Sequence, residues 1–151
     1  MTTISQKDPV AEAVKNMISP DQSGVVYVAK RYIVEAMAAG AANAFAFAVQ
    51  NPEGECIVTS VIVDITTAGG TASSVLDVAA DATSTGDSII DGLDLNATGV
   101  ADRHDDAGTN GGEALKWDKN GGTNDYITGK ILVQDALSLA GSVIIEYVPL
   151  S

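Results

Sequence analysis

Four side chains with metal-binding chemistry lie close together in the second half of the chain. Asp102, His104, Asp105 and Asp106 fall within one short stretch. Carboxylates on a loop are the ligands that Ca²⁺ prefers, and a histidine beside carboxylates can bind a transition metal. The spacing matches no ligand template, however, and charged runs normally face water, so a solvated acidic loop is the alternative. These four residues are the candidate metal ligands, and the sequence predicts no cofactor.

Nucleophilic catalysis has little support in the sequence. Cys56 is the only cysteine and His104 the only histidine, and no neighbouring group would lower the pKa of the thiol. A small buried hydrophobic side chain is therefore the expected role of Cys56. The glycine runs at residues 108–112 and 121–122 lack both a Walker lysine and a following helix, and no carboxylate pair is marked out for glycoside hydrolysis. We predict that the protein is not an enzyme.

Aromatic side chains offer one further kind of site. Trp117, Tyr126 and Tyr147 could stack on a sugar, and Trp117 is the candidate interaction residue of this group. The alternative role of Trp117 is to cover the edge of a sheet.

The overall charge limits the partners that the protein can bind. The 151 residues carry a formal net charge of −12, and eleven acids lie between Asp77 and Asp125. Such a field repels phosphate backbones, so we expect no nucleic-acid partner. No apolar run approaches the ~20 residues that span a bilayer, so we expect no membrane partner. Polar residues follow Met1, which predicts no secretory signal and synthesis in the cytoplasm.

The longest β-branched stretch, residues 55–68 (ECIVTSVIVDITTA), is the centre of the predicted fold. β-branched side chains fit a pleated surface, and alternation at period two is typical of a strand with one buried face. One predicted face contains Ile57, Thr59, Val61, Val63, Ile65 and Thr67, and the other contains Val58, Ser60, Ile62, Asp64 and Thr66.

Further strands are predicted on both sides of this stretch. They cover residues 25–34, 44–50, 74–80, 126–133 and 142–148, with a short one at 113–117. Residues 35–42 could form a helical turn, and residues 88–95 could be either a strand or a helical turn. The turn at residues 51–54 contains proline and glycine, so residues 44–68 are predicted to form a β-hairpin.

Seven or eight short strands separated by turns indicate an all-β domain over residues 23–151. A two-sheet β-sandwich accounts for this count, with a jelly roll as the favoured arrangement. An immunoglobulin-like sandwich is the runner-up, although the sequence lacks the Cys–Trp–Cys pattern of that fold.

Residues 1–22 are predicted to form an N-terminal arm with a short helix. Asp8 and Pro9 suit the start of a helix, and Ser19-Pro20 would end it. The apolar stripe consists of Val10, Val14, Met17 and Ile18. A helix this short is marginal alone, so these four residues are candidate interaction residues that dock on the chain's own sheet or on a neighbouring subunit.

Two parts of the chain resemble a known group of proteins. They are SVIVDITTAGGTASSVLDVAADATSTGDSIIDGLDLNATG at residues 60–99 and YITGKILVQDALSLAGSVIIEYVPL at 126–150, with GTNGG between them. Their most recognisable features are the D-x-x-x-DGLD element and the closing IEYVPL. This region looks like virion proteins of tailed bacteriophages that are encoded near the major capsid protein. The resemblance covers about residues 60–150 and leaves the N-terminal part aside.

The resemblance implies a capsid decoration, or cement, protein on the surface of the virion. Such proteins are commonly β-rich homotrimers whose partner is the major capsid protein. The alternative function is a jelly-roll module of a head or tail fibre that binds a receptor or a glycan.

Overall fold

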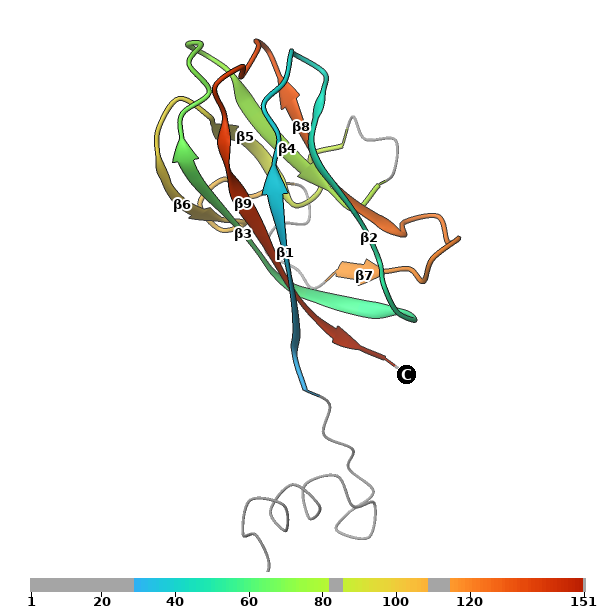
Figure 1. The fold of residues 1–151 in the computed structure, drawn as a ribbon. Coiled ribbons are helices and arrows are strands. Elements are labelled where there is room, and N and C mark those ends of the chain that lie inside the picture. The colour runs from blue at the N-terminus through green and yellow to red at the C-terminus, as the bar shows by residue number, and fades with distance from the viewer. Residues whose placement is uncertain (1–28, 82–85, 109–114, 151) are drawn as a thin grey trace, which may run out of the picture.

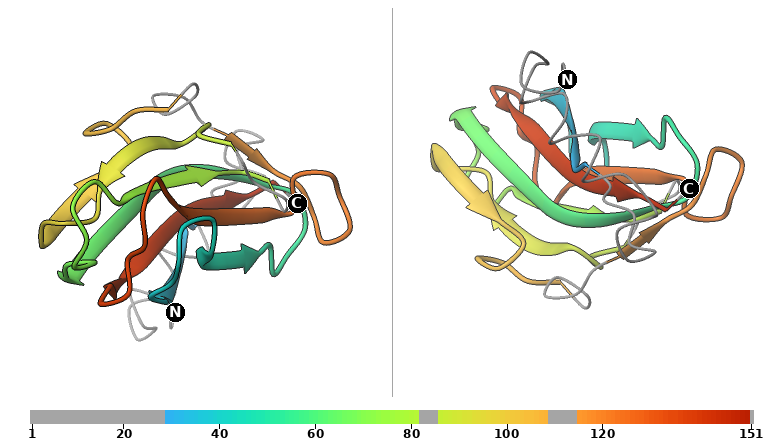
Figure 2. Two further views of the ribbon diagram at one scale, coloured as in Figure 1. Left: turned by 90° about the horizontal axis from the view of Figure 1, so that it is seen from above. Right: turned by 90° about the horizontal axis from the view of Figure 1, so that it is seen from below.

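The computed structural model describes residues 29–81, 86–108 and 115–150, which form two antiparallel sheets packed face to face (Figures 1 and 2). The described residues contain strands and connections but no helix. The strands are β1 (Arg31–Met37), β2 (Phe45–Gln50), β3 (Cys56–Thr67), β4 (Val75–Ala79), β5 (Ile90–Asp94), β6 (Gly99–Asp102), β7 (Leu115–Trp117), β8 (Tyr126–Leu132) and β9 (Ala140–Pro149). The predicted β-sandwich is therefore confirmed.

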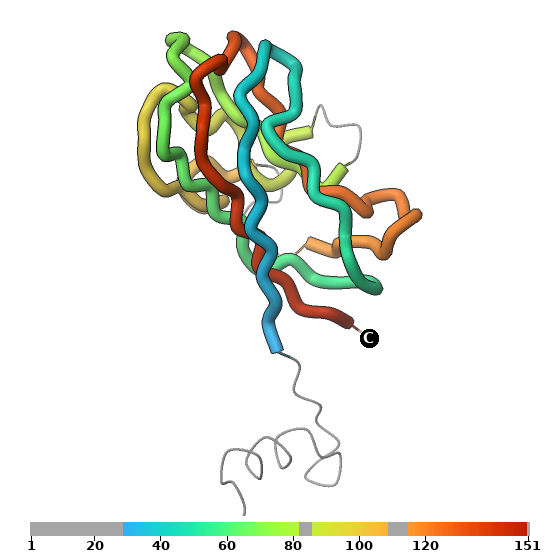
Figure 3. The backbone as a smooth tube through the Cα atoms, in the orientation of Figure 1, coloured from blue at the N-terminus to red at the C-terminus, as the bar shows by residue number. Residues whose placement is uncertain are grey.

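The strand order is that of a jelly roll. One sheet runs β1-β9-β3-β6, with β7 on the same edge of β3 as β6, and the other runs β2-β8-β4-β5. The chain changes sheet at six of the eight connections between these strands, so strands that are neighbours in the sequence are seldom neighbours in a sheet. Figure 3 shows this for the first sheet, where β9, from the C-terminal end of the chain, lies between β1 and β3. This order excludes the immunoglobulin-like alternative.

The same strand order corrects the predicted hairpin over residues 44–68. β2 pairs with β8 in the four-stranded sheet, whereas β3 pairs with β9 in the other sheet. The turn at residues 51–54 therefore carries the chain between the sheets. A proline–glycine turn reverses the chain direction in either case, so the turn signal alone could not distinguish a hairpin from a sheet-to-sheet connection.

β3 forms as predicted, but its buried face was assigned wrongly in the first third of the strand. Val61, Val63 and Ile65 are buried as expected, whereas Ile57 and Thr59 are only partly covered and Cys56 and Val58 are buried instead. The register against β9 shifts between Val58 and Ser60, so one extra residue occupies β3 there. Such a β-bulge moves the following side chains to the opposite face, which a strict period of two cannot anticipate.

A second irregularity changes the predicted alternation in β2. Phe45 is exposed, while its neighbours Ala46 and Phe47 are both buried, because the register against β8 shifts between Phe45 and Phe47. The ring of Phe47 packs directly on the backbone of Gly129, where any Cβ atom would collide with it. A glycine is needed at position 129 for this close approach.

The remaining predictions concern two possible helical turns, the short strands and the N-terminal segments. Residues 88–95 contain strand β5, and residues 35–37 continue β1, so neither segment forms a helical turn. β6 was not predicted, because residues 99–102 (GVAD) are too short to show a period. The predicted strand at 25–34 overlaps β1, while residues 25–28 and the predicted helix with Val10, Val14, Met17 and Ile18 lie outside the described residues.

The core lies between the sheets and is almost entirely aliphatic. The five-stranded sheet contributes alternating residues such as Val63 of β3 and Val143 and Ile145 of β9, all with no exposed surface. The facing sheet contributes Leu76 of β4 and Ile131 of β8, which are equally buried. Among the described residues, the aromatic rings of Trp117 and Tyr147 pack edge to face, with their centroids 5.5 Å apart.

Candidate functional site

The predicted metal ligands form a turn that satisfies its own hydrogen bonds. The Oδ1 atom of Asp102 accepts a bond of 2.7 Å from the His104 amide, and Asp105 Oδ2 accepts one of 2.8 Å from the Asp102 amide. The Asp106 carbonyl accepts a bond of 3.0 Å from the Asp91 amide. Within residues 29–81, 86–108 and 115–150, no group of three or more His, Cys, Asp or Glu side chains is placed to hold a metal ion. The carboxylates of Asp102 and Asp105 therefore fix the shape of a turn.

Cys56 and Trp117 are both part of the interior. Burial raises the pKa of the Cys56 thiol, which stabilises the protonated, unreactive form. Trp117 has no exposed surface, and its Nε1 atom donates a hydrogen bond of 3.0 Å to the Asp125 carbonyl. The ring cannot stack on a sugar unless the core opens. Of the three aromatic residues considered for stacking on a sugar, Trp117 and Tyr147 are buried, whereas Tyr126 is partly exposed.

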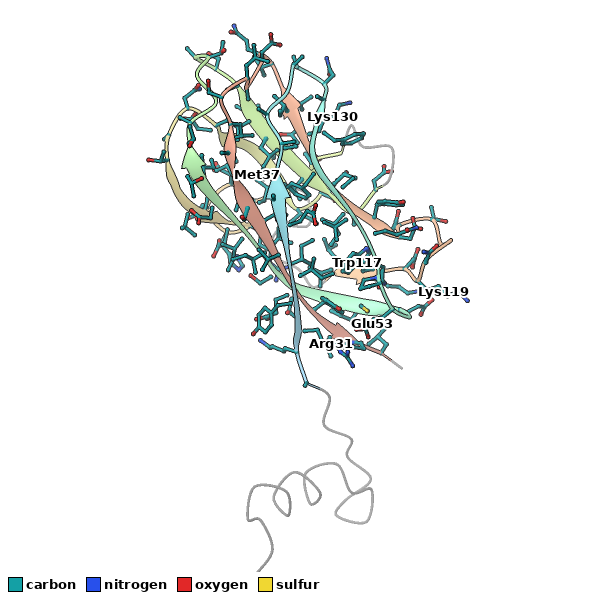
Figure 4. The ribbon with its side chains drawn as sticks, viewed as in Figure 1. Arg31, Met37, Glu53, Trp117, Lys119 and Lys130 are labelled. Atoms are coloured by element: carbon teal, nitrogen blue, oxygen red, sulfur yellow. The ribbon has the colours of Figure 1, made fainter. Side chains whose placement is uncertain are left out.

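Trp117 belongs to one end of the sandwich, which we call the polar end and define by residues 51–55 and 118–125. Figure 4 shows Arg31, Glu53 and Trp117 in this lower part of the domain, with Met37 and Lys130 farther up. The organising side chain is Asn51, of which 1% is exposed. Its Nδ2 atom donates to the carbonyls of Gly54, Trp117 and Asp118 over 2.9 to 3.1 Å.

The rest of the polar end is also held by side chains. Asp125 accepts hydrogen bonds from Gln50 Nε2 at 3.0 Å and from the Gly121 amide at 2.9 Å, and these bonds lower the pKa of its carboxyl group. Glu53 accepts a hydrogen bond from the Tyr147 hydroxyl and pairs with Arg31 at 3.0 Å. The side chains of Asn51, Glu53 and Asp125 are therefore engaged within the chain, where they fix the shape of this end.

The opposite end of the sandwich has a different composition. We call it the aliphatic end and define it by three connections, residues 38–44, 68–74 and 133–139, which lie side by side at the top of Figure 1. Asp135 is the only charged residue of these three connections, in a chain with a net charge of −12. Val133 and Leu137 are 68% and 66% exposed. Val133 lines an open hollow of about 290 Å³, together with Ala42, Thr71, Gln134 and Asp135.

Main-chain hydrogen bonds join the three connections to one another. Gly40 and Ala136 exchange two bonds, of 3.2 and 2.8 Å, and the Ser138 amide donates to the Gly69 carbonyl over 3.1 Å. One side chain takes part, because Asp135 Oδ1 accepts a bond of 2.8 Å from the Ala42 amide. The exposed aliphatic groups are consequently presented on a fixed backbone.

Backbone strain is concentrated at the aliphatic end. Among the described residues, three that are not glycine have a positive φ: Asn43 at 72°, Ser73 at 73° and Val133 at 68°. Each lies in a different one of the three connections. Asparagine tolerates this conformation, but for a β-branched residue such as Val133 it is a genuine outlier. Strained residues of this kind are found mainly at functional sites, so the aliphatic end is the candidate functional site.

The sequence analysis did not identify this site. Alanine, glycine, serine and threonine dominate the three connections, and such composition indicates only turns. The scarcity of charge in three separate segments, with Asp135 as their one charged residue, was the available signal, but its meaning depends on those segments meeting in space.

Comparisons of the chain with protein-family models, with curated proteins and with solved structures gave no match. Within the described part of the chain, no helix has the length and apolar character needed to cross a membrane.

Proposed function

We propose that this protein is a structural virion protein of the capsid decoration type. It binds the outer shell formed by the major capsid protein and stabilises it, and the aliphatic end is the surface that contacts the shell. The observation that carries this proposal is the exposure of Val133 and Leu137 on an almost uncharged, strained and internally bonded end of an acidic protein.

The chemistry of the aliphatic end suits a protein surface as its partner. Exposed aliphatic groups gain free energy when another apolar surface removes them from water, at roughly 25 cal/mol per Å². The field of a protein with a charge of −12 disfavours phosphate-rich partners, whereas one weakly charged end can approach a folded shell without desolvating many charges.

The rigidity of the aliphatic end contributes to binding. A surface that is already ordered before contact loses less conformational entropy when it binds. The paired amides and carbonyls of Gly40 and Ala136 supply that order without using the side chains that would make the contact. Because the protein binds the assembled shell and not its free subunits, each contact stabilises the assembled state by linkage.

A co-sedimentation experiment with shells that lack this protein tests the proposal. Leu137→Asp places a charge in the middle of the aliphatic end, so we expect it to weaken binding at least tenfold and to remove the added thermal stability of the shell. Val100→Asp is the matched control, because Val100 is equally exposed, at 68%, but lies on β6 and away from the three connections. It should bind as the wild type does.

Two results would contradict the proposal. One is a wild-type protein that does not co-sediment with shells. The other is a Leu137→Asp variant that folds and still binds as tightly as the wild type does.

A further inference from the structure

Asp135 is the one charged residue of the three connections, and it lines the hollow at the aliphatic end. The other residues that line this hollow of about 290 Å³ are Ala42, Thr71, Val133 and Gln134. Among residues 29–81, 86–108 and 115–150, no lysine, arginine or histidine forms an ion pair with Asp135. The surface that we propose to contact the shell therefore contains one negative charge without a positive partner.

Hydrogen bonds hold the carboxylate of Asp135 at this hollow. Its Oδ1 atom accepts the 2.8 Å bond from the Ala42 amide, which belongs to another connection. Ala136, the next residue in the chain, exchanges two main-chain bonds with Gly40 of that same connection. If the carboxylate turned away into water, the Ala42 amide would lose this acceptor. The charge therefore stays in place when a partner approaches.

A partner that covers the aliphatic end removes this carboxylate from water. An ionised carboxylate that is buried without a positive partner loses its hydration and gains nothing in return, so an entirely apolar partner would bind poorly here. In the described part of the chain no group donates to Oδ2 of Asp135, and Thr71 and Gln134 supply further oxygen acceptors in the lining. The partner that fits this hollow brings hydrogen-bond donors with a positive charge.

We propose that the hollow receives an arginine side chain of the shell, surrounded there by apolar residues that contact Val133 and Leu137. This inference rests on the proposed function and specifies the chemistry of the partner. A guanidinium group has five N–H donors and no acceptor, and it binds carboxylates through two parallel hydrogen bonds. It is more weakly hydrated than the ammonium group of lysine, so it enters an interface at a smaller cost. Arginine is accordingly enriched in protein interfaces, whereas lysine is depleted.

The size and the surroundings of the hollow agree with one side chain as its occupant. Pockets that enclose a small molecule have volumes of roughly 300–1,000 Å³. An open hollow of about 290 Å³ suits a single protruding side chain better than a separate ligand. Val133 lines the hollow and Leu137 lies two residues beyond Asp135, so exposed aliphatic surface lies beside the charge. The methylene groups of an arginine pack on such surface while its charged head binds the carboxylate.

Co-sedimentation with shells tests the charge of Asp135. Asp135→Asn keeps an oxygen that can accept the Ala42 amide bond but removes the charge, so we expect binding to weaken at least tenfold. Binding of the wild type should also fall more steeply with rising salt than binding of this variant. Asp91→Asn is the matched control, because it makes the same change in net charge at an exposed position of β5, and it should bind as the wild type does. Far-ultraviolet circular dichroism establishes that each variant is folded.

A measurement on the free, full-length chain tests the hollow without the shell. Ethylguanidinium has the charged head of an arginine side chain, and N-ethylurea is a neutral molecule of similar shape. In a titration followed by amide nuclear magnetic resonance, ethylguanidinium should shift the signals of Ala42, Gln134 and Asp135, whereas N-ethylurea should not. Asp135→Asn should abolish these shifts, and Asp91→Asn should retain them.

The outcomes separate this inference from the proposed function. If Leu137→Asp weakens binding to shells and Asp135→Asn does not, the aliphatic end contacts the shell but the arginine is overturned. If the two small molecules shift the same signals equally, or neither shifts them, the hollow does not select a positive charge and the inference fails. A wild type that does not bind shells overturns the proposed function and the shell as the source of the arginine, while shifts caused by ethylguanidinium alone would still support an arginine of another protein.

Discussion

At the aliphatic end of the sandwich, mainly main-chain atoms hold the connections together, whereas at the polar end side chains do so. Gly40 and Ala136 bond through their backbones, but Asn51 and Asp125 bond through an amide and a carboxylate. Both arrangements provide hydrogen bonds between the connecting segments, but they leave different side chains exposed at the surface. Connections joined by their backbones leave their side chains available for a partner, whereas at the polar end Asn51, Glu53 and Asp125 already have partners within the chain. This difference explains why the aliphatic end is the better candidate for binding.

The largest expected effect concerns the side-chain network of the polar end. Asn51→Ala removes the donor shared by the carbonyls of Gly54, Trp117 and Asp118, and leaves buried acceptors without a partner. We expect the free energy of unfolding to fall by about 3 kcal/mol, as measured by chemical denaturation.

The control for this substitution is Asn120→Ala, in an exposed position of the same end. It should change the free energy of unfolding by less than about 0.5 kcal/mol. If the two variants were equally stable, the polar end would not depend on its side chains and the contrast with the aliphatic end would be lost.

A smaller effect of opposite sign is expected at the aliphatic end. Val133 has a φ of 68°, a conformation that costs a β-branched residue roughly 1–2 kcal/mol and that asparagine tolerates. Val133→Asn should therefore raise the free energy of unfolding by about 1 kcal/mol in thermal or chemical denaturation. Because it also removes an exposed aliphatic group, it should weaken binding to the shell.

Val100→Asn is the control for this prediction. Val100 is just as exposed, but it lies in a strand and does not have a positive φ, so no gain in stability is expected. A loss of stability in Val133→Asn would mean that the strain at this end is not relieved by asparagine.

The smallest effect is a difference in acid sensitivity. The hydrogen bonds from Gln50 and from the Gly121 amide lower the pKa of Asp125. The unfolded chain therefore takes up a proton at a higher pH than the folded chain does. The stability that Asp125 contributes is present above the ordinary carboxyl pKa and is lost as the pH falls toward the lowered value.

Trp117 reports this change directly, because it is the only tryptophan and its Nε1 atom bonds to the Asp125 carbonyl. Its near-ultraviolet circular dichroism should change in acid before the far-ultraviolet signal does. Asp125→Asn should remove this early change, and a variant that kept it would assign the acid sensitivity to another group.

Long regular strands were predictable from the sequence to within a few residues. Residues 126–133 correspond to β8 and residues 142–148 to β9, in which Val143, Ile145 and Tyr147 are buried in strict alternation. β-branched residues at period two produce a strand with one apolar face in almost any context, so local information is sufficient. The bulges near Thr59 and Phe45 were not predictable, because an extra residue in one strand depends on the partner strand.

The sequence by itself determined that this protein forms two layers of sheet around an aliphatic core, because the alternation of apolar residues allows little else. Only the tertiary structure decided which strands lie side by side, since main-chain hydrogen bonds are the same for every sequence and do not identify a partner. It also decided that Trp117 is internal and that three connections with one charged residue among them, distant in the sequence, meet at one end. The properties of a surface depend on what converges there, and the jelly-roll strand order brings these three connections together.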